Sequence, residues 1–567
     1  MKISVYIFSL LAFIFWAFIY KSHIFFVEQF SYFLYCSEYW REYALQPGGW
    51  AAYSGNFLSQ FYYNRWAGAL IQTGLFCSLM FFSKRILNKT SEIGSMLMFA
   101  APLSALLLWA LQCDNRFTPG DALTFIFPYA ITYLYISISQ VAFRRVALTA
   151  AIVPAYLFAG AVPLCSLIVA CTVYELFLQK DKWRYCLLLW TPLAILLPQI
   201  WQLVYLTRDD NLFKILSFEV ADQLSYAPLL ILAYIPVCLI IISIVAQTKI
   251  KVITPLKFKI LRVIVVLVCQ LVFGYYLFTI SYDRLEEQKF AMSIATSEGN
   301  WDNVLKISRK VKNPDMQTTY FTNLALAVKG ELPEKMFSYP QIGEYGLLLM
   351  RLDEYSMRYG SEFFYHIGIL NEAIRWIYDA HILRRKGMDY HTLKRLALWN
   401  KEAGYLPVAE KYFDILEKTL MYRSWAKTKR SETMHEKQQT TANKSEFFIG
   451  GREPISDIAR HYDNDPQNVL TRDYMLCYLL LKNDFQRFMN VFMYIYEHNM
   501  YNERLPQAYQ EAILLVANMG RIELQNFPIE QINITRFEQF KQLAEIGNRT
   551  QLKRRFSDTL WYYIYNI

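Results

Sequence analysis

Long uncharged apolar runs fill the first half of the chain, and shorter runs with helical periodicity fill the second half. The last long run, Val263–Ser281, has nineteen residues without a charge. At about 1.5 Å per helical residue, such a run reaches across a hydrocarbon core of about 30 Å. We expect it to be the final membrane span. Residues 1–281 would then form a transmembrane domain and residues 282–567 a soluble one.

Eight further apolar runs precede this span. They cover residues 3–20, 66–82, 95–112, 122–143, two within 146–178, 185–206 and 226–246. The run 146–178 is too long for one ordinary span and holds Gly160 and Pro163 near its middle, so we expect two short helices there. The first run begins after Lys2 like a signal peptide but ends without a small-residue cleavage site, so we expect it to remain as a helix. The sequence therefore predicts about nine spans.

Basic residues favour one orientation of these spans. Residues 1–281 carry eight of the ten net positive charges of the chain. With the N-terminus in the cytoplasm, 13 lysines and arginines lie at cytoplasmic ends of spans, against Arg116, Arg208 and Lys214 in the short external loops. An odd number of spans then places the soluble domain outside the cytoplasm. Because the charges follow the loops, they give no indication of nucleic-acid binding.

The cysteines and the scarcity of charges within the spans argue against several other classes of protein. Eight of the nine cysteines lie in the transmembrane domain and no C-x-x-C occurs, so we expect neither a zinc site nor a disulfide framework. The one ionisable side chain within the spans is Glu175, which we expect to reach the membrane interface beside Lys180. Ion-coupled transporters usually carry carboxylates or histidines at membrane depth, so a transporter is disfavoured.

Acidic residues gather instead on the expected outer face. The first external loop, residues 21–65, is long, and within it Glu38 and Glu42 are four residues apart on one face of a helix. The second external loop carries Asp114 and Asp121. Two loops on one side of the membrane thus supply the candidate chemical groups.

Part of the first loop resembles a hallmark of a bacterial family of unknown function. The residues that carry the resemblance are Gln46–Trp50, Asn56–Tyr63 and Gly68–Ala69. Members of that family have a polytopic membrane half followed by a soluble helical half, over most of the length of this chain. The resemblance implies the same architecture and a bacterial inner membrane, and it implies no activity.

The loop layout also resembles that of membrane glycosyltransferases of the C type. The resemblance implies that Glu38 or Glu42 activates an acceptor and that Asp114 joins it in acting on a lipid-linked sugar at the outer face. It also implies that Arg65 and Arg116 hold the lipid phosphate, with a divalent cation as cofactor and no permanent protein-bound metal. The chain departs from that pattern, because neither loop has a D-x-D and the first-loop acids are glutamates.

Ordinary structural roles explain the same residues. Glu38 and Glu42 then form the solvated face of an interfacial helix, and Asp114 and Asp121 cap helix ends. The alternative function is a non-catalytic envelope scaffold that anchors a protein-interaction domain. The transferase hypothesis requires the acids of the two loops to converge, and the scaffold hypothesis does not.

The soluble half carries a repeated turn pattern. Gly299, Asn483 and Gly547 each begin a pattern with matching positions two, five and nine residues later, for example Phe485, Phe488 and Phe492, and a shifted version begins at Gly404. The pattern is typical of tetratricopeptide-like helix pairs, although its spacing is uneven, so we expect a divergent α-solenoid-like, all-helical domain. Such repeats normally bind a protein or peptide partner.

Two further features of the soluble half are a polar stretch in its middle and an apolar stretch at its end. The polar stretch 431–445 is expected to be a linker between repeat regions 282–430 and 446–567. The apolar end, residues 560–565, is expected to dock onto the domain rather than stay exposed. The seven histidines are scattered and form no metal-binding or hydrolase motif.

Overall fold

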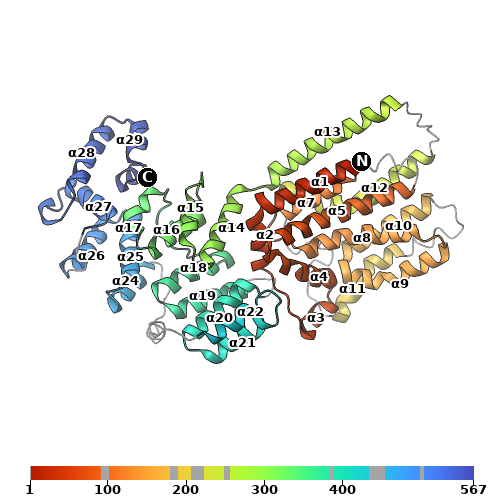
Figure 1. Ribbon diagram of the computed structural model, residues 1–567, viewed down its shortest axis with the longest axis horizontal. Helices are drawn as coiled ribbons and strands as arrows, with labels where there is room; N and C mark the ends of the chain where they lie inside the picture. The colour runs from red at the N-terminus through yellow and green to blue at the C-terminus, as the bar shows by residue number, and fades with distance from the viewer. Residues whose placement is uncertain are drawn as a thin grey trace. The chain divides into compact units, whose positions relative to one another are not determined.

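In the computed structural model, all regular secondary structure among the described residues is helical. The chain divides into two compact units (Figure 1): Met1–Arg284 with Glu417–Trp425, and Leu285–Leu416 with Ala426–Ile567. The described residues are 2–90, 101–178, 185, 190–205, 222–247, 256–383, 388–432, 454–498 and 504–566. Four expectations lie wholly or mostly outside them: the linker 431–445 and the positions of Lys180, Arg208 and Lys214.

The first unit is built from long apolar helices with shorter helices in the first loop. Its main helices are α1 (Lys2–Ile14), η1 (Phe15–Ile19), α2 (Lys21–Gln29), α3 (Ser37–Ala44), α4 (Gly49–Ser59), η2 (Gln60–Tyr63), α5 (Arg65–Thr90), α7 (Pro102–Gln112), α8 (Pro119–Ser137), α9 (Val141–Ala159), α10 (Ala161–Val173), η4 (Tyr174–Leu178), α11 (Trp190–Tyr205), α12 (Ala227–Gln247) and α13 (Leu256–Ser281).

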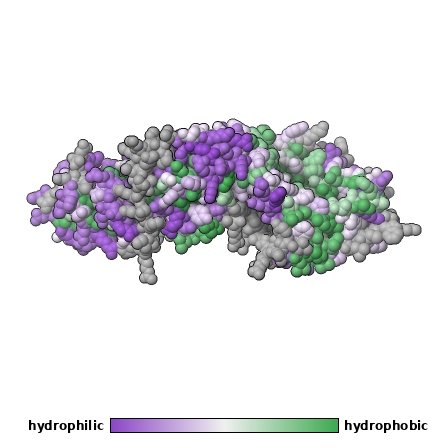
Figure 2. Space-filling model, turned by 90° about the horizontal axis from the view of Figure 1, so that it is seen from below, coloured by the Kyte–Doolittle hydropathy of each residue, from purple (hydrophilic) through white to green (hydrophobic). Residues whose placement is uncertain are grey.

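Four of the described helices are long and apolar enough to cross a membrane, or five if a bent pair near the N-terminus is one span. They are Arg65–Thr90, Val141–Ala159, Ala161–Leu178 and Ala227–Val245, with Val5–Ile19 and Lys21–Gln29 as the pair bent by 71°. Apolar side chains gather on this unit in Figure 2, at the right, whereas polar ones predominate on the second unit. These helices indicate an integral membrane protein, and the number of nine spans stays a prediction.

Gly160 divides the long run 146–178 as the sequence predicts. Its φ of 83° ends α9, and α10 begins at the next residue. A residue with a side chain rarely adopts this conformation, so glycine fits the break. The start of α9 differs from the prediction, because the preceding helix α8 ends at Ser137 and Arg144 lies inside α9 rather than in a loop.

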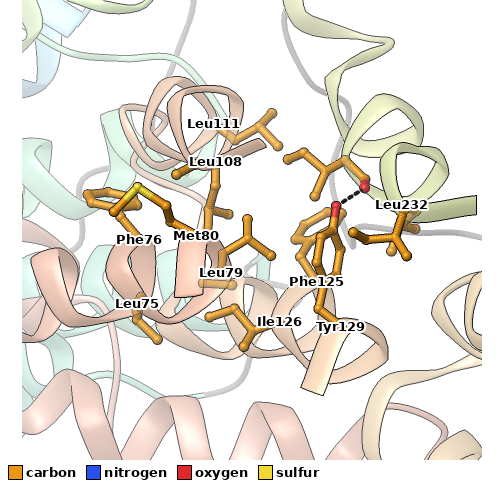
Figure 3. Packing of buried hydrophobic residues seen from close by; sticks show 14 of the residues in the cluster. Leu75, Phe76, Leu79, Met80, Leu108, Leu111, Phe125, Ile126, Tyr129 and Leu232 are labelled. Carbon is orange, nitrogen blue, oxygen red and sulfur yellow. Dashed lines mark hydrogen bonds between the residues drawn. The ribbon is translucent and has the colours of Figure 1, made fainter. Parts of the chain in front are cut away.

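The core of the first unit lies where α5, α7, α8 and α12 meet (Figure 3). Leu79 of α5 and Leu108 of α7 are fully buried there. On α8 the hydroxyl of Tyr129 donates a hydrogen bond to the carbonyl of Ile231 in α12. A buried hydroxyl needs such a partner, because the apolar side chains around it supply none.

The glycines of the first-loop motif have packing roles. Gly48 has a φ of 74° and donates its N–H to the carbonyl of Tyr156 in α9. A Cβ on Gly55 would lie 2.1 Å from the backbone nitrogen of Gly120, at the start of α8. Similarly, a Cβ on Gly68 would lie 2.5 Å from the side chain of Ile24. The motif therefore seats α4 closely against α8 and α9.

The second unit consists of short helices. From Arg284 onward the helices are α14 (Arg284–Ser297), α15 (Trp301–Ser308), α16 (Met316–Val328), α17 (Leu332–Lys335), α18 (Glu354–Ile367), α19 (Leu370–Leu383), α20 (Tyr390–Glu402), α21 (Leu406–Glu417), α22 (Arg423–Ser431), α24 (Pro454–Asn464), α25 (Val469–Leu481), α26 (Phe485–Glu497), α27 (Gln507–Asn518), α28 (Gln531–Glu545), α29 (Arg549–Phe556) and α30 (Leu560–Tyr565).

The four turns that the sequence singles out share one backbone conformation. Gly299, Gly404, Asn483 and Gly547 all have a positive φ, between 58° and 81°. In each turn the next residue donates its N–H to the carbonyl five residues earlier, at 2.8–3.2 Å. This is the bonding of a helix end closed by a left-handed residue. The pattern therefore marks real helix ends, while its identity as a tetratricopeptide repeat stays a prediction.

Three further turns of the same kind escaped the sequence pattern, because the residues after them do not match it. They are centred on Gly330, Gly368 and Gly520. Together with Gly299 and Gly404, the first two give spacings of 31, 38 and 36 residues. The helix ends of this region are thus more regular than the sequence indicated.

Helix α25 is central to the second unit. It contacts α16, α17 and α18, and its residues from Tyr474 to Leu481 are all buried. The ring of Tyr474 lies 4.7 Å from that of Phe363 in α18. A helix that is apolar on every side is expected to be buried on every side. The later helices therefore occupy a surface of the earlier ones that an open solenoid would leave free.

The C-terminal helix α30 docks as predicted. Leu560 and Trp561 are buried, and the indole N–H of Trp561 donates to the carbonyl of Glu511 in α27 at 2.8 Å. The Glu511 carboxylate in turn accepts the backbone N–H of Leu560 at 2.7 Å. The apolar end thus completes the last core of the chain.

Candidate functional site

The first-loop acids that the sequence singles out lie on α3. Glu38 and Glu42 are both exposed. The side chain of Glu38 accepts the Ser37 hydroxyl at 3.0 Å, and a hydrogen bond to its own backbone together with this one lowers its pKa. Both glutamates face away from the ring of Tyr39, which is buried on the other side of the helix. This placement matches the solvated face of an interfacial helix.

The second-loop acid is held within its own turn. Asp114 accepts the backbone N–H of Arg116 at 2.9 Å and two guanidinium N–H groups of the same residue at 2.8 and 3.0 Å. Nearby, Asp121 caps α8 by accepting both the N–H and the hydroxyl of Thr118. The expected capping role of Asp121 is therefore confirmed.

The five predicted site residues do not form one cluster through their contacts. Arg116 pairs with Asp114, whereas the exposed guanidinium of Arg65 lies 4.5 Å from the ring centre of Trp66. Among the described residues, no hydrogen bond or ion pair joins Glu38 or Glu42 to Asp114. The catalytic and phosphate-binding roles of these residues stay predictions.

A buried acid near the same loop was missed by the sequence reasoning. Glu28 at the end of α2 is fully buried, and it accepts the Tyr422 hydroxyl at 3.0 Å. The amide of Gln29 donates to the same hydroxyl at 2.5 Å. No sequence signal connects residues so far apart, because Tyr422 comes from a segment that joins the first unit only in the folded chain.

A cluster of buried charge in the first unit lies between α9 and η4. Glu175 has no exposed surface and accepts Arg145 Nη2 at 2.6 Å through Oε2. Its other oxygen, Oε1, is ion-paired with Arg144 and accepts the Tyr135 hydroxyl at 3.0 Å. Glu175 is therefore paired with two arginines inside the protein, and its expected place at the membrane interface beside Lys180 stays a prediction, because Lys180 lies outside the described residues.

Aromatic rings complete this cluster. The Arg144 guanidinium lies 5.5 Å from the ring centre of Tyr135 and 5.4 Å from that of Tyr174. Ring faces attract a guanidinium, so these contacts help to hold the Arg144 side chain, which is only 4% exposed. Glu175 and Tyr174 belong to a short π-helical turn, and such turns often occur at functional sites.

One sequence signal could have found the cluster. Arg145 and Glu175 are each fifteen residues from Gly160. Two helices that fold back on each other at Gly160 therefore place these two residues side by side, far from the turn. From the sequence alone, both arginines are expected in a loop, because the apolar run before them continues to Phe143. In the structure that run breaks at Ile138, and the arginines begin the next helix.

The second unit uses its buried charges to join helices. Arg358 in α18 is fully buried and donates to both carboxylate oxygens of Asp389, at 2.9 and 3.0 Å. Burial raises the pKa of Glu362 in the same helix, and Arg395 at 2.7 Å opposes that effect. Among the described residues, no group of three histidines, cysteines or acids is placed to hold a metal ion.

Taken together, the helices and these groups define an all-helical protein with several apolar helices that suit a membrane. The chain belongs to a family of unknown function, DUF6057, whose model matches residues 1–567. The sequence-based resemblance to a family without an assigned activity agrees with this match. No curated protein and no solved structure matches the chain.

Proposed function

We propose that this protein is a membrane-anchored scaffold: the first unit holds it in a membrane, and the second binds a partner protein. The main support is an exposed apolar face on α19 and α21. Tyr378 and Ile382 are one turn apart on α19, with exposed fractions of 46% and 63%. Val408, on α21, is 39% exposed. Tyr412, a turn further along α21, has a pKa raised by burial and by the nearby Tyr378.

Exposed apolar side chains from two helices suit a protein partner. Large aromatic and aliphatic anchors supply most of the binding energy in protein interfaces. The largely buried helices α16, α18 and α25 leave the outer helices as the surfaces for an interaction. The partner would therefore contact this apolar face rather than an open groove of the repeats.

The transferase hypothesis is less well supported by the geometry. It requires a first-loop glutamate to act together with Asp114 on one lipid-linked sugar. Asp114 instead bonds three N–H groups of Arg116, and Glu38 and Glu42 are on a solvated helix face. Scaffold function does not require these acids to meet.

The anchor would have nine spans, with the N-terminus in the cytoplasm of a bacterial cell and the second unit outside. Basic residues at one end of the first unit support this orientation. Lys89 of α5 lies over the ring of Tyr133 in α8, and Arg144 and Arg145 lie near the start of α9, the helix that follows α8. The ends of these helices thus share one side, which the proposal assigns to the cytoplasm.

Photo-crosslinking tests the partner-binding face. A photoreactive amino acid at position 382 of the full-length protein is expected to give a discrete protein adduct in cells. The same probe at Ile532, which is 70% exposed on α28, is the matched control and is expected to give none of that adduct. Replacing Val408 by Asp should weaken the adduct at 382. Equal adducts at both positions, or adducts to lipid alone, would contradict the proposal.

A further inference from the structure

Helix α29 presents a strongly basic surface. Its eight residues, Arg549–Phe556, include four basic side chains and no acidic one. Leu552 and Phe556, one turn apart, are buried in the last core of the chain. The four basic side chains are exposed, and they are Arg549, Lys553, Arg554 and Arg555. The helix therefore packs by one side and carries its positive charges on the surface.

Most of these charges are not balanced within the protein. The side chains of Arg549, Lys553 and Arg554 make no hydrogen bond or ion pair in the part of the chain that the structure describes. Asp558, two residues after the helix, pairs instead with Arg536 at 2.6 Å. Between these two residues the chain has six basic side chains and three acidic ones, both ends included. The end of the second unit thus keeps an excess of positive charge.

Helix stability explains only part of this placement. The last turn of a helix favours basic side chains, because the negative end of the macrodipole lies there, and Arg554 and Arg555 are in that turn. Arg549 is in the first turn, where a positive charge is unfavourable, and it repels Lys553 four residues later. Residues that work against the local structure are expected where they serve an interaction.

An exposed apolar side chain lies next to these charges in the chain. Ile546, three residues before Arg549, is 76% exposed. Gly547, with a φ of 72°, forms the turn between Ile546 and α29. Basic residues beside an exposed aliphatic group suit an anionic bilayer, because its headgroups attract the charges and its interior accepts the apolar group. An acidic protein surface would match the charges alone.

We propose that α29, together with Ile546, is a docking surface for a bilayer that contains anionic phospholipids. Arg549, Lys553 and Arg554 supply the electrostatic attraction, and Ile546 adds an apolar contact. This surface is separate from the partner-binding face on α19 and α21. The proposal therefore does not rest on the scaffold function.

Vesicle binding by the full-length protein tests this surface. The protein is held in nanodiscs of phosphatidylcholine and mixed with vesicles of phosphatidylcholine alone or with added phosphatidylglycerol. We expect the nanodiscs to float only with the vesicles that contain phosphatidylglycerol. In R549Q/K553Q/R554Q the affinity should fall at least about tenfold, because each basic residue near an anionic surface corresponds to about a fivefold change in affinity.

A matched variant removes three other exposed charges of the second unit. The side chains of Lys306, Lys310 and Lys312 likewise make no hydrogen bond or ion pair within the described ranges, and K306Q/K310Q/K312Q should bind as the wild type does. I546S keeps every charge and should weaken binding about threefold or more, so it serves as a second variant if the first does not fold.

Three results would overturn the proposal. They are no binding to the vesicles with phosphatidylglycerol, an equal loss of affinity in both triple variants, and undiminished binding by I546S. Polyglutamate is the probe for the other kind of anionic partner. Binding to polyglutamate but to neither kind of vesicle would assign the surface to an acidic protein and would equally overturn the proposal.

Discussion

Glu175 and Arg145 are thirty residues apart in the chain, and their side chains are joined at 2.6 Å between Oε2 and Nη2. Gly160 lies midway between them and ends α9 with a φ of 83°. The pair therefore fastens the two arms of a helical hairpin at the end opposite to its turn. Arg144 binds the same carboxylate and adds a second positive charge to the closure.

The pairing of Glu175 with the two arginines predicts how variants that break it lose stability. E175A would remove the buried carboxylate that is paired with both arginines, and removal of one partner of a buried pair costs about 3–5 kcal/mol. The double variant R145M/E175M removes both members of one pair and is expected to lose less thermal stability than E175A. Unfolding temperatures of the purified full-length protein check the order. A double variant less stable than E175A would show that the pair does not close the hairpin in this way.

The close packing of α4 on α8 predicts that alanine at two different glycines has opposite effects on stability. In G55A the new methyl group would meet the backbone of Gly120, and we expect a loss of about 1–3 kcal/mol. Gly74, in the middle of α5, has open space around an added Cβ, so G74A serves as the matched control. It should be neutral or stabilising by up to about 1 kcal/mol. Similar unfolding temperatures for the two variants would contradict the packing of α4 on α8.

The docking of the C-terminal helix predicts a pH dependence. Burial raises the pKa of Glu511 from 4.5 to about 7, against hydrogen bonds from Leu560 and Gln507 that lower it. A carboxyl group with a raised pKa in the folded state stabilises the fold fully below pH 4.5, and it loses that contribution as the pH rises through 7. The difference corresponds to about 3 kcal/mol.

We therefore expect the second unit to unfold more readily at pH 8 than at pH 5. In E511Q this part of the pH dependence should disappear. Trp561 donates to the carbonyl of Glu511, so the difference in fluorescence between the wild type and W561F reports the undocking. An unchanged pH dependence in E511Q would assign the effect to other groups.

Features of the structure that depend on neighbouring residues could be predicted from the sequence, whereas features that depend on contacts between distant residues could not. The break at Gly160 and the helix ends at Gly299, Gly404, Asn483 and Gly547 were predictable, because local backbone conformation decides them. The apolar terminus also docks as predicted. Interactions between distant segments were not predictable: nothing local shows that α25 fills the space against α16 and α18.

The candidate site illustrates the same limit. Glu38, Glu42 and Asp114 are predicted as site residues from the sequence, because acids in external loops can take part in catalysis. The buried acids of the first unit, Glu28 and Glu175, are not predicted as site residues from the sequence, because their partners come from other helices. Burial and pairing, rather than residue type, distinguish the two groups.

The scaffold proposal predicts that the outer acids are dispensable. The triple variant E38Q/E42Q/D114N should fold and give the same protein adduct from the probe at position 382 as the otherwise unchanged chain. Its side chains keep most of the present contacts, since Asn can still accept the N–H groups of Arg116. Release of polyprenyl phosphate from a lipid-linked sugar by the wild type, and its loss in the triple variant, would instead support the transferase hypothesis.

The most direct test of the account is the side of the membrane on which the second unit lies. Alkaline phosphatase and green fluorescent protein are fused in turn after Ile567 of the full-length chain and produced in bacterial cells. Alkaline phosphatase folds into its active form outside the cytoplasm, whereas the fluorescent protein matures inside. We predict an active phosphatase fusion and a dark fluorescent fusion. A fluorescent fusion with inactive phosphatase would contradict nine spans and place the partner-binding face in the cytoplasm.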